Sequence, residues 1–306
     1  MNIKLTLHNI SIPVLLALLI VYIVWGSTYL VIRFTIDSIP PFMLTGGRSF
    51  LAGISLVAIA LMRKQTIPSK AQTWNAILVG AIMFGGGAGL VAFSEKWVES
   101  GLTALGVAAT PIWAAIFVGL WGKWPNRLEW IGLLIGLIGI VILNMENGMR
   151  GNPIGAMALI VGPMMWAFAS MWSRRLNMPE GFMSAAFQLL GGAFVLVFIS
   201  YFAGESMTTF PTQQAVFGFF YLTIISSLIT FTAYIYLVRT VRPSLATSYA
   251  YVNPVIAVML GVFFADESIT TTGIVAMIVI LTGVALLAFG KERKKPEAIQ
   301  ATLSKA

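Results

Sequence analysis

Cysteine is absent from this 306-residue chain, histidine occurs once, as His8, and charged residues make up only 10% of the sequence. Without cysteine the chain can form no disulfide, no thiolate nucleophile and no Cys-ligated metal site. One histidine in the N-terminal tail cannot build a His-ligated metal centre. The sequence therefore predicts no metal and no cofactor, and the low charge argues against a water-soluble globule.

Apolar side chains are abundant: AVILMFWYC account for 58% of the residues, and the mean hydropathy is +0.89. A helix needs about 20 apolar residues to cross the hydrocarbon core of a bilayer. Runs of roughly this length recur along the chain, separated by polar breaks too short for a soluble domain. We therefore predict an all-α integral membrane protein with ten transmembrane helices, at 12–32, 41–62, 74–94, 102–120, 129–144, 154–172, 181–203, 215–238, 245–264 and 273–290.

Lysine and arginine are unevenly distributed between the two sets of loops. With ten spans both tails lie on one side, and the segments on that side carry 15 of the 19 Lys and Arg residues. Arg48 falls inside a span, and the other side carries Arg33, Lys96 and Arg150. Because positive loops stay in the cytoplasm, we predict cytoplasmic N- and C-termini and a cytoplasmic Arg174-Arg175 loop.

The two halves of the chain resemble each other at an offset of about 140 residues. The matched residues occur in the same order in both halves, which chance rarely produces four times. We therefore predict two repeats, 12–150 and 151–290, between a cytoplasmic N-terminal tail, 1–11, and a basic cytoplasmic C-terminal tail, 291–306. The matched pairs are Trp25/Arg33 with Trp166/Arg174, Arg48 with Gln188, Thr110-Pro111 with Asn253-Pro254, and Gly139 with Gly283.

Each predicted repeat contains five spans, so the second repeat enters the membrane from the side opposite to the first. Such an inverted repeat can pack in two related ways that open one central site to either side of the membrane. This feature favours a secondary transporter that works by alternating access. An integral-membrane enzyme would need a polar catalytic cluster, and a channel would need a ring of charges or a re-entrant loop. The sequence shows neither, so no enzyme activity is predicted.

Several segments carry a family resemblance: Trp25-Gly26-Ser27-Thr28-Tyr29, Arg48, Pro111, residues 245–254 (LATSYAYVNP), Asp266-Glu267 and Gly283. Together with the inverted repeat, they resemble the EamA family of the drug/metabolite transporter superfamily over the whole chain. The resemblance implies a bacterial inner (plasma) membrane and a central cavity lined by spans 1, 2, 4, 6, 7 and 9. It also implies export of amino acids, small metabolites or amphiphilic drugs. A nucleotide-sugar or phosphate-ester transporter is the alternative.

Arg48 is the single charge inside a predicted span, and a charge there costs about 2.5–3.5 kcal/mol to insert. Intramembrane charges are usually functional, so we interpret Arg48 as substrate-binding; the alternative is a structural arginine bound to backbone carbonyls. No acidic residue lies well inside a span, and Glu95, at the end of span 3, comes nearest. An anionic or electron-rich substrate is therefore favoured over a cation. Uniport, exchange and coupling through Glu95 stay open.

Other candidate site residues lie on the same spans. Pro111, Pro163 and Pro254 are mid-span prolines, and we predict that they break their helices beside a wet cavity. Trp25 and Trp166 lie away from the membrane interfaces, where an indole ring can stack on a ligand or fill the core. The remaining substrate-binding candidates, for each of which packing is the alternative role, are Ser27, Thr28, Thr110, Ser170, Gln188, Tyr249, Tyr251 and Asn253.

Two further motifs indicate packing and lipid contact rather than nucleotide binding. The run at 85–89 (GGGAG) follows no strand and lacks the Gly-Lys-Ser/Thr ending of a phosphate loop. Close helix packing is predicted for it and for Gly132-x-x-x-Gly136. The cluster Lys291, Arg293, Lys294 and Lys295 predicts contact with anionic lipid headgroups. The predicted partners are thus a small-molecule substrate and the bilayer, and nucleic acid is not among them.

Overall fold

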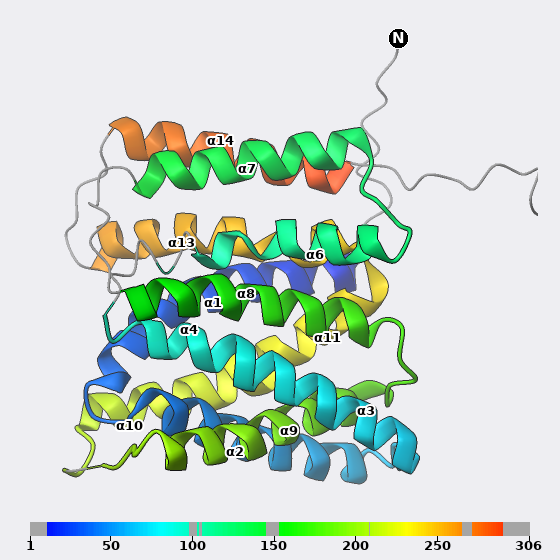
Figure 1. Cartoon of the computed structure of the whole chain (residues 1–306), viewed down its shortest axis with the longest axis vertical. Coiled ribbons are helices and arrows are strands. Elements are labelled where there is room, and N and C mark those ends of the chain that lie inside the picture. Colours follow the sequence, from blue (N-terminus) through cyan, green and yellow to red (C-terminus); the bar gives the residue numbers. More distant parts are fainter. Residues whose placement is uncertain are drawn as a thin grey trace, which may run out of the picture.

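The computed structural model describes residues 11–97, 103, 106–144, 153–207, 209–264 and 271–289, and all regular structure within them is helical. The helices run side by side in layers, as Figure 1 shows. Both predicted tails apart from Ser11, the basic cluster at 291–295 and the acidic pair Asp266-Glu267 lie outside the described residues.

The described residues contain six apolar stretches of helix long enough to cross a membrane. They are α1 (Ile12–Ile36), α2 (Pro41–Met62), α3–η2–α4 (Lys70–Gly80, Ala81–Ala88, Gly89–Ser94), α8 (Pro153–Ser173), α9 (Gly181–Phe202) and α10–η3–α11 (Gln213–Tyr221, Leu222–Thr230, Phe231–Thr240). These correspond to predicted spans 1, 2, 3, 6, 7 and 8. The other four predicted spans overlap the shorter helices α6 (Thr110–Leu120), α7 (Arg127–Asn144), α13 (Tyr249–Phe264) and α14 (Thr271–Phe289), and a short α12 (Pro243–Ala246) precedes α13.

Local sequence explains where several helices begin. Pro13 and Pro41 lie in the first turns of α1 and α2, where a missing N–H costs nothing. Ser69 and Gln72 form a capping box at the start of α3, in which each side chain binds the other residue's backbone N–H. Gly181 immediately precedes the body of α9 with φ of +56°, a conformation that a side chain would strain.

Two helix pairs form the most extensive contacts, α2 with α9 and α7 with α14. In lipid, helices associate through close packing rather than through the hydrophobic effect, so small residues mark these contacts. A Cβ on Gly132 would lie 2.9 Å from the carbonyl oxygen of Gly283, so α7 and α14 can approach only because both residues are glycine. The α7/α14 pair, which corresponds to spans 5 and 10, lies at one edge of the bundle (Figure 1), and neither span was expected to line the cavity.

Two segments of the bundle are π-helical, η2 and η3, and each interrupts a long span. η2 begins at Ala81 and η3 at Leu222, about 140 residues apart, which is the offset of the sequence repeat. The Thr230 hydroxyl donates to the carbonyl of Ile225, five residues earlier, over 2.7 Å. Short π segments widen a helix locally and are frequent at functional sites.

The predicted breaks at proline are corrected by the structure in two of three cases. α8 runs through Pro163 and α13 runs through Pro254, so neither proline ends its helix. Tight packing on neighbouring helices holds a helix together despite one missing donor. At Pro111 the chain does change: Ala109 is in a turn, and α6 begins at Thr110.

The loops at the two ends of the bundle form separate groups. At one end, the Gln65 side chain accepts from the Phe182 backbone N–H (3.1 Å), and Gln72 donates to Asn177 (3.2 Å). Arg175 lies over the Trp121 ring at 5.3 Å. We call this the arginine-rich end. At the other end, which we call the Glu205 end, Arg33 of α1 donates to the Glu95 carbonyl (2.9 Å).

Candidate functional site

A cavity of about 110 Å³ lies between the helices, in the half of the bundle nearer the Glu205 end. Residues from α1, α2, η2, α4, α6, α8, η3, α11 and α13 line it. The expected set of lining spans is therefore corrected: α9, which is span 7, contributes no described residue, whereas spans 3 and 8 do. The reason is packing, because α9 lies against α2 and α3 on their far side, and η2 and η3 occupy the space beside the cavity.

The structure brings together seven of the eleven predicted substrate-binding residues. Their side chains come from five separate segments of the chain, so only tertiary packing makes them neighbours. These cavity-lining residues are Trp25, Thr28, Arg48, Thr110, Trp166, Tyr249 and Asn253, and Pro163 joins them. The hydroxyls of Thr28 and Thr110 bind carbonyls of their own helices, at 2.7 and 2.6 Å.

The other four predicted residues do not line the cavity. Ser27 shares a hydrogen bond with the Tyr221 hydroxyl (2.6 Å), on the side of α1 facing α10. Tyr251 donates to the carbonyl of Leu133 (2.9 Å) and packs on α7. Gln188 is buried against α3, where a Cβ on Gly80 would overlap its carbonyl oxygen. Gln188 donates to the carbonyl and the hydroxyl of Ser184, four residues earlier in α9, both over 3.1 Å, and its side-chain oxygen has no partner among the described residues.

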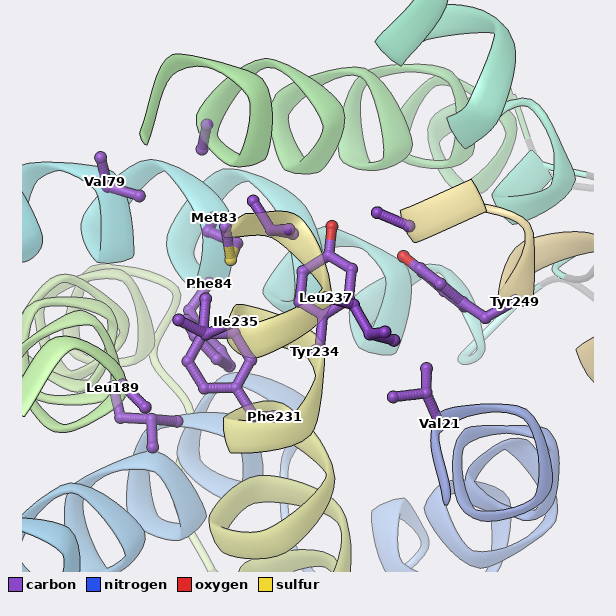
Figure 2. Close-up of a cluster of buried hydrophobic side chains, with 14 of the residues drawn as sticks. Val21, Val79, Met83, Phe84, Leu189, Phe231, Tyr234, Ile235, Leu237 and Tyr249 are labelled. Carbon is purple, nitrogen blue, oxygen red and sulfur yellow. The ribbon is translucent and has the colours of Figure 1, made fainter. Parts of the chain in front are cut away.

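An aromatic cluster closes the cavity toward the arginine-rich end. Trp25 lies 5.6 Å from Trp166, 5.0 Å from Tyr234 and 4.8 Å from Tyr249, measured between ring centroids. The Trp166 indole donates to the Tyr234 hydroxyl (3.1 Å), which donates to Ser170 (2.8 Å). Figure 2 shows Tyr234 and Tyr249 among the buried side chains, with Phe84 and Phe231 beside them. Ser170 thus supports the closure rather than the cavity wall.

Two arginines at the arginine-rich end bind groups of neighbouring segments. Arg174, at the end of α8, donates to the carbonyls of Val238 (2.7 Å) and Val241 (2.9 Å). Arg239 donates to the carbonyl of Pro179 (2.5 Å) and to the Ser184 hydroxyl (2.9 Å). These bonds tie α8, α9 and α11 together at the arginine-rich end.

A buried ion pair completes that end. Arg242 contacts the Glu129 carboxylate at 3.0 Å and donates to the carbonyl of Leu287 (2.8 Å). Glu129 also accepts from the Ser244 hydroxyl (2.7 Å) and from the Asn126 backbone N–H (2.9 Å). The pair therefore links α7, α12 and α14. Its charges are hydrogen-bonded throughout, which a buried pair needs to be stable.

Arg48 and Glu95 are buried near each other at the Glu205 end, with their polar atoms largely unengaged. Arg48 is 7% exposed and lines the cavity, and its Nε has no hydrogen-bond partner among the described residues. Glu95 is 3% exposed, and neither of its carboxylate oxygens has a partner among those residues. It lies one residue beyond the apolar span Lys70–Ser94. Burial raises the pKa of Glu95 to about 8, while the positive charges of Arg33 and Arg48 act in the opposite direction.

Glu205 is the second buried carboxylate at this end, and it is fully engaged. It accepts from the backbone N–H groups of Phe42 (3.2 Å) and Met43 (2.9 Å), and from the Ser200 hydroxyl (3.0 Å). Lys96 lies 4.0 Å from it. A carboxylate at a helix N-terminus is stabilised by the free N–H groups and by the helix dipole, so Glu205 caps α2.

The sequence analysis missed the contribution of η2 and η3 to the cavity. The missed lining residues are Tyr29, Ile32, Phe84, Gly87, Ala88, Val91, Ala92, Val107, Ser226, Ser227 and Phe231. The sequence did carry a signal for this contribution, because Ser226-Ser227 follows the glycine run at 85–89 by about 140 residues, which is the offset of the repeat. Among the described residues, no three His, Cys, Asp or Glu side chains group together to hold a metal ion.

The fold and the cavity define a polytopic helical membrane protein with a central site. The chain belongs to the EamA-like transporter family, which matches residues 12–145 and again residues 153–289. It is 41% identical over 280 residues to the uncharacterized inner membrane transporter YedA of Escherichia coli strain K12, covering 91% of this chain and 92% of that protein. The chain is thus a membrane transporter rather than an enzyme.

More distant proteins also match this chain over most of its length. The uncharacterized transporter YoaV of Bacillus subtilis strain 168 is 23% identical over 290 residues, covering 93% of this chain and 99% of that protein. A solved crystal structure with 20% sequence identity superposes with a TM-score of 0.75, covering 89% of this chain and 95% of the other. At this identity the likeness shows the fold, and it extends across the whole bundle.

Proposed function

We propose that the protein is a secondary transporter of small molecules that works by alternating access, as an exporter in the bacterial inner membrane. In this structure the cavity is closed toward the arginine-rich end by the cluster of Trp25, Trp166, Tyr234 and Tyr249. The single observation that carries the proposal is a central cavity, lined by helices of both halves and bordered by these aromatic rings, that contains a buried, partly unpaired arginine.

Packing between the halves supports a 5+5 inverted repeat with units 12–150 and 151–290. A symmetry that relates spans 1–5 to spans 6–10 maps the contact between α1 and α13 onto the contact between α8 and α6. Both contacts are present. The contact of α8 with η2 likewise becomes that of α1 with η3, also present. The pairs α2/α9 and α7/α14 each exchange with themselves. Two related halves of this kind can adopt two packings that expose one site in turn.

The ligand that best fits the cavity is a small molecule with an anionic or electron-rich group and an apolar or aromatic body. Arg48 supplies the positive charge, and its planar group suits a carboxylate. Phe84, Trp166 and Phe231 supply aromatic surface. Among the described lining residues Arg48 is the one cation, which disfavours nucleotide-sugars and phosphate esters. A volume of about 110 Å³ favours a metabolite over a large amphiphilic drug in this conformation.

Ligand binding is testable by a thermal-shift screen of the purified protein against amino acids, small carboxylates and amphiphilic drugs. Arg48→Gln should abolish the stabilisation by a ligand that raises the melting temperature of the parent protein. Arg48→Lys should keep part of it, because the charge survives although the planar fork is lost. Lys123→Gln, an exposed change at the other end, is the control. An Arg48→Gln protein that responds like the parent would refute the binding role.

Orientation is a separate part of the proposal: the termini and the arginine-rich end face the cytoplasm, where basic loops can contact anionic headgroups. The chain has no cysteine, so Lys123→Cys and Gln214→Cys, both exposed, give single labelling sites at opposite ends. In intact cells, an impermeant maleimide should label position 214 and not position 123. Labelling of both from outside, or the reverse pattern, would overturn the orientation.

A further inference from the structure

Two buried groups of opposite charge lie at the Glu205 end without forming a salt bridge. Glu95 and Arg48 interact electrostatically, yet no Arg or Lys nitrogen of the described residues lies within 4.0 Å of the Glu95 carboxylate. Arg33 binds the backbone carbonyl of Glu95, not its carboxylate. A buried carboxylate without hydrogen bonds or a close cation is strongly disfavoured in its ionised form.

Two arginines compensate the charge of Glu95, and the electrostatic effect of Arg33 on it is larger than that of Arg48. From α1, Tyr29 and Arg33 face it, and from α2, Arg48 does. The Arg33 side chain is exposed, so solvent and salt screen its charge. Of the other elements packed on α4, η2 and α8 carry no ionisable side chain. Lys96 follows Glu95 in the chain, but its ammonium faces Glu205. Arg48 is therefore the one buried cation near Glu95 in the described residues.

One cation cannot neutralise two anions. When an anionic ligand group pairs with Arg48, an ionised Glu95 would be left as a second buried negative charge beside it. The free energy of the site is then lowered if a proton from solvent forms an O–H bond on a Glu95 carboxylate oxygen. When the ligand leaves, Arg48 again compensates the Glu95 charge, so the affinity of Glu95 for the proton falls and, above about pH 8, the proton returns to solvent. No bond of the ligand forms or breaks in this cycle.

We propose that Glu95 is a proton-binding site linked to Arg48, so that the transporter binds one anionic ligand group and one proton together. This inference rests on the proposed function of Arg48. Because binding linkage is reciprocal, a proton on Glu95 strengthens anion binding by the factor by which the anion strengthens proton binding. Above about pH 8, where the ligand-free protein has lost this proton, an anion and a proton bind together and move in the same direction, so the metabolite gradient and the proton gradient act on one combined flux.

The linkage is testable with benzoate as the probe, since it joins a carboxylate to an aromatic ring, and with benzamide as its neutral counterpart. For the parent protein, benzoate affinity should be constant at low pH and should fall above about pH 8, approaching tenfold per pH unit. For Glu95→Gln it should be independent of pH. Glu180→Gln, an exposed carboxylate at the arginine-rich end, should behave like the parent. Benzoate binding that keeps the same pH dependence in Glu95→Gln would overturn the proposal.

A measurement without ligand separates failure of this linkage from failure of ligand binding. The folded protein holds the Glu95 proton up to about pH 8, whereas an unfolded glutamate loses it near pH 4.3. The folded state thus binds more protons between these values. The parent's melting temperature should therefore fall, relative to Glu95→Gln, as pH rises from about 5 to about 8, and should then level off.

Without the nearby cation, the proton should be held to a higher pH. The comparison is between Arg48→Gln and the double variant Arg48→Gln/Glu95→Gln. The melting temperature of Arg48→Gln, relative to that of the double variant, should continue to fall beyond pH 8. Parallel pH profiles for the parent and Glu95→Gln would overturn the proton site. A decline that ends at the same pH with and without Arg48 would overturn its link to Arg48, whether or not benzoate binds.

Discussion

The two ends of the bundle treat buried charge in opposite ways. At the arginine-rich end, Arg174, Arg239 and Arg242 bind carbonyls, a hydroxyl and a carboxylate at 2.5–3.0 Å. At the Glu205 end, Arg48 and Glu95 keep buried polar atoms without partners among the described residues, and so does Thr45. The first end uses charge to hold helices together. The second end retains unsatisfied groups, which are costly for stability alone; the proposed binding of a ligand by Arg48 and of a proton by Glu95 would account for two of them.

Glu205 shows that the contrast does not come from the chemistry of carboxylates. Glu95 and Glu205 lie at the same end, and both are buried. Glu205 meets the free N–H groups at the start of α2, whereas Glu95 follows the end of α4, where backbone carbonyls rather than N–H groups are free. A carboxylate is therefore structural at the first position and available for a proton at the second.

The largest effect on this comparison should come from breaking the ion pair at the arginine-rich end. Glu129→Ala removes a carboxylate that accepts from Arg242, Ser244 and the Asn126 N–H, and it takes the negative partner away from Arg242. The expected loss is about 3–5 kcal/mol of unfolding free energy, measured by chemical denaturation in detergent. Glu180→Ala, at an exposed site of the same end, should cost far less. Equal losses for the two variants would mean that the ion pair between Glu129 and Arg242 does not hold the helices together at this end.

An intermediate effect is expected at the aromatic closure. Tyr234→Phe keeps the ring but removes the hydroxyl between Trp166 and Ser170, leaving a buried indole N–H without its acceptor. This should cost about 1–3 kcal/mol and increase access of an impermeant reagent to the cavity from the arginine-rich end. Tyr236→Phe, two residues away at a position 38% exposed, is the matched control. A Tyr234→Phe protein as stable as this control would contradict the assigned role of the hydroxyl.

The smallest effect should occur at Lys96. Its side chain is 38% exposed, and its ammonium lies 4.0 Å from Glu205, whose carboxylate keeps three hydrogen bonds without it. Lys96→Ala should therefore change the unfolding free energy by about 0–1 kcal/mol, as judged by the same denaturation curves. A loss comparable to that of Glu129→Ala would show that the Glu205 end also depends on an ion pair, and the contrast between the ends would disappear.

The sequence by itself predicted the membrane class, the helical stretches and the repeat offset, and it singled out Arg48, which the structure places in the cavity wall. These follow from local composition and from the high cost of a charge within a span, which any packing must respect. The loops that charge counting assigned to one side, near Gln65, Trp121 and Arg175, do lie together. The offset also reappears in η2 and η3, where no sequence match had been noted.

Only the tertiary structure decided which side chains share the cavity. Tyr249 and Tyr251 are two residues apart in one motif, yet Tyr249 lines the cavity and Tyr251 packs on α7, because a helix turns about 100° per residue. Gln188 matches Arg48 by repeat but faces a helix contact. The distance between Glu95 and Arg48 was likewise invisible along the chain. Composition fixes what enters the membrane, whereas rotation and packing of the helices fix what each side chain meets there.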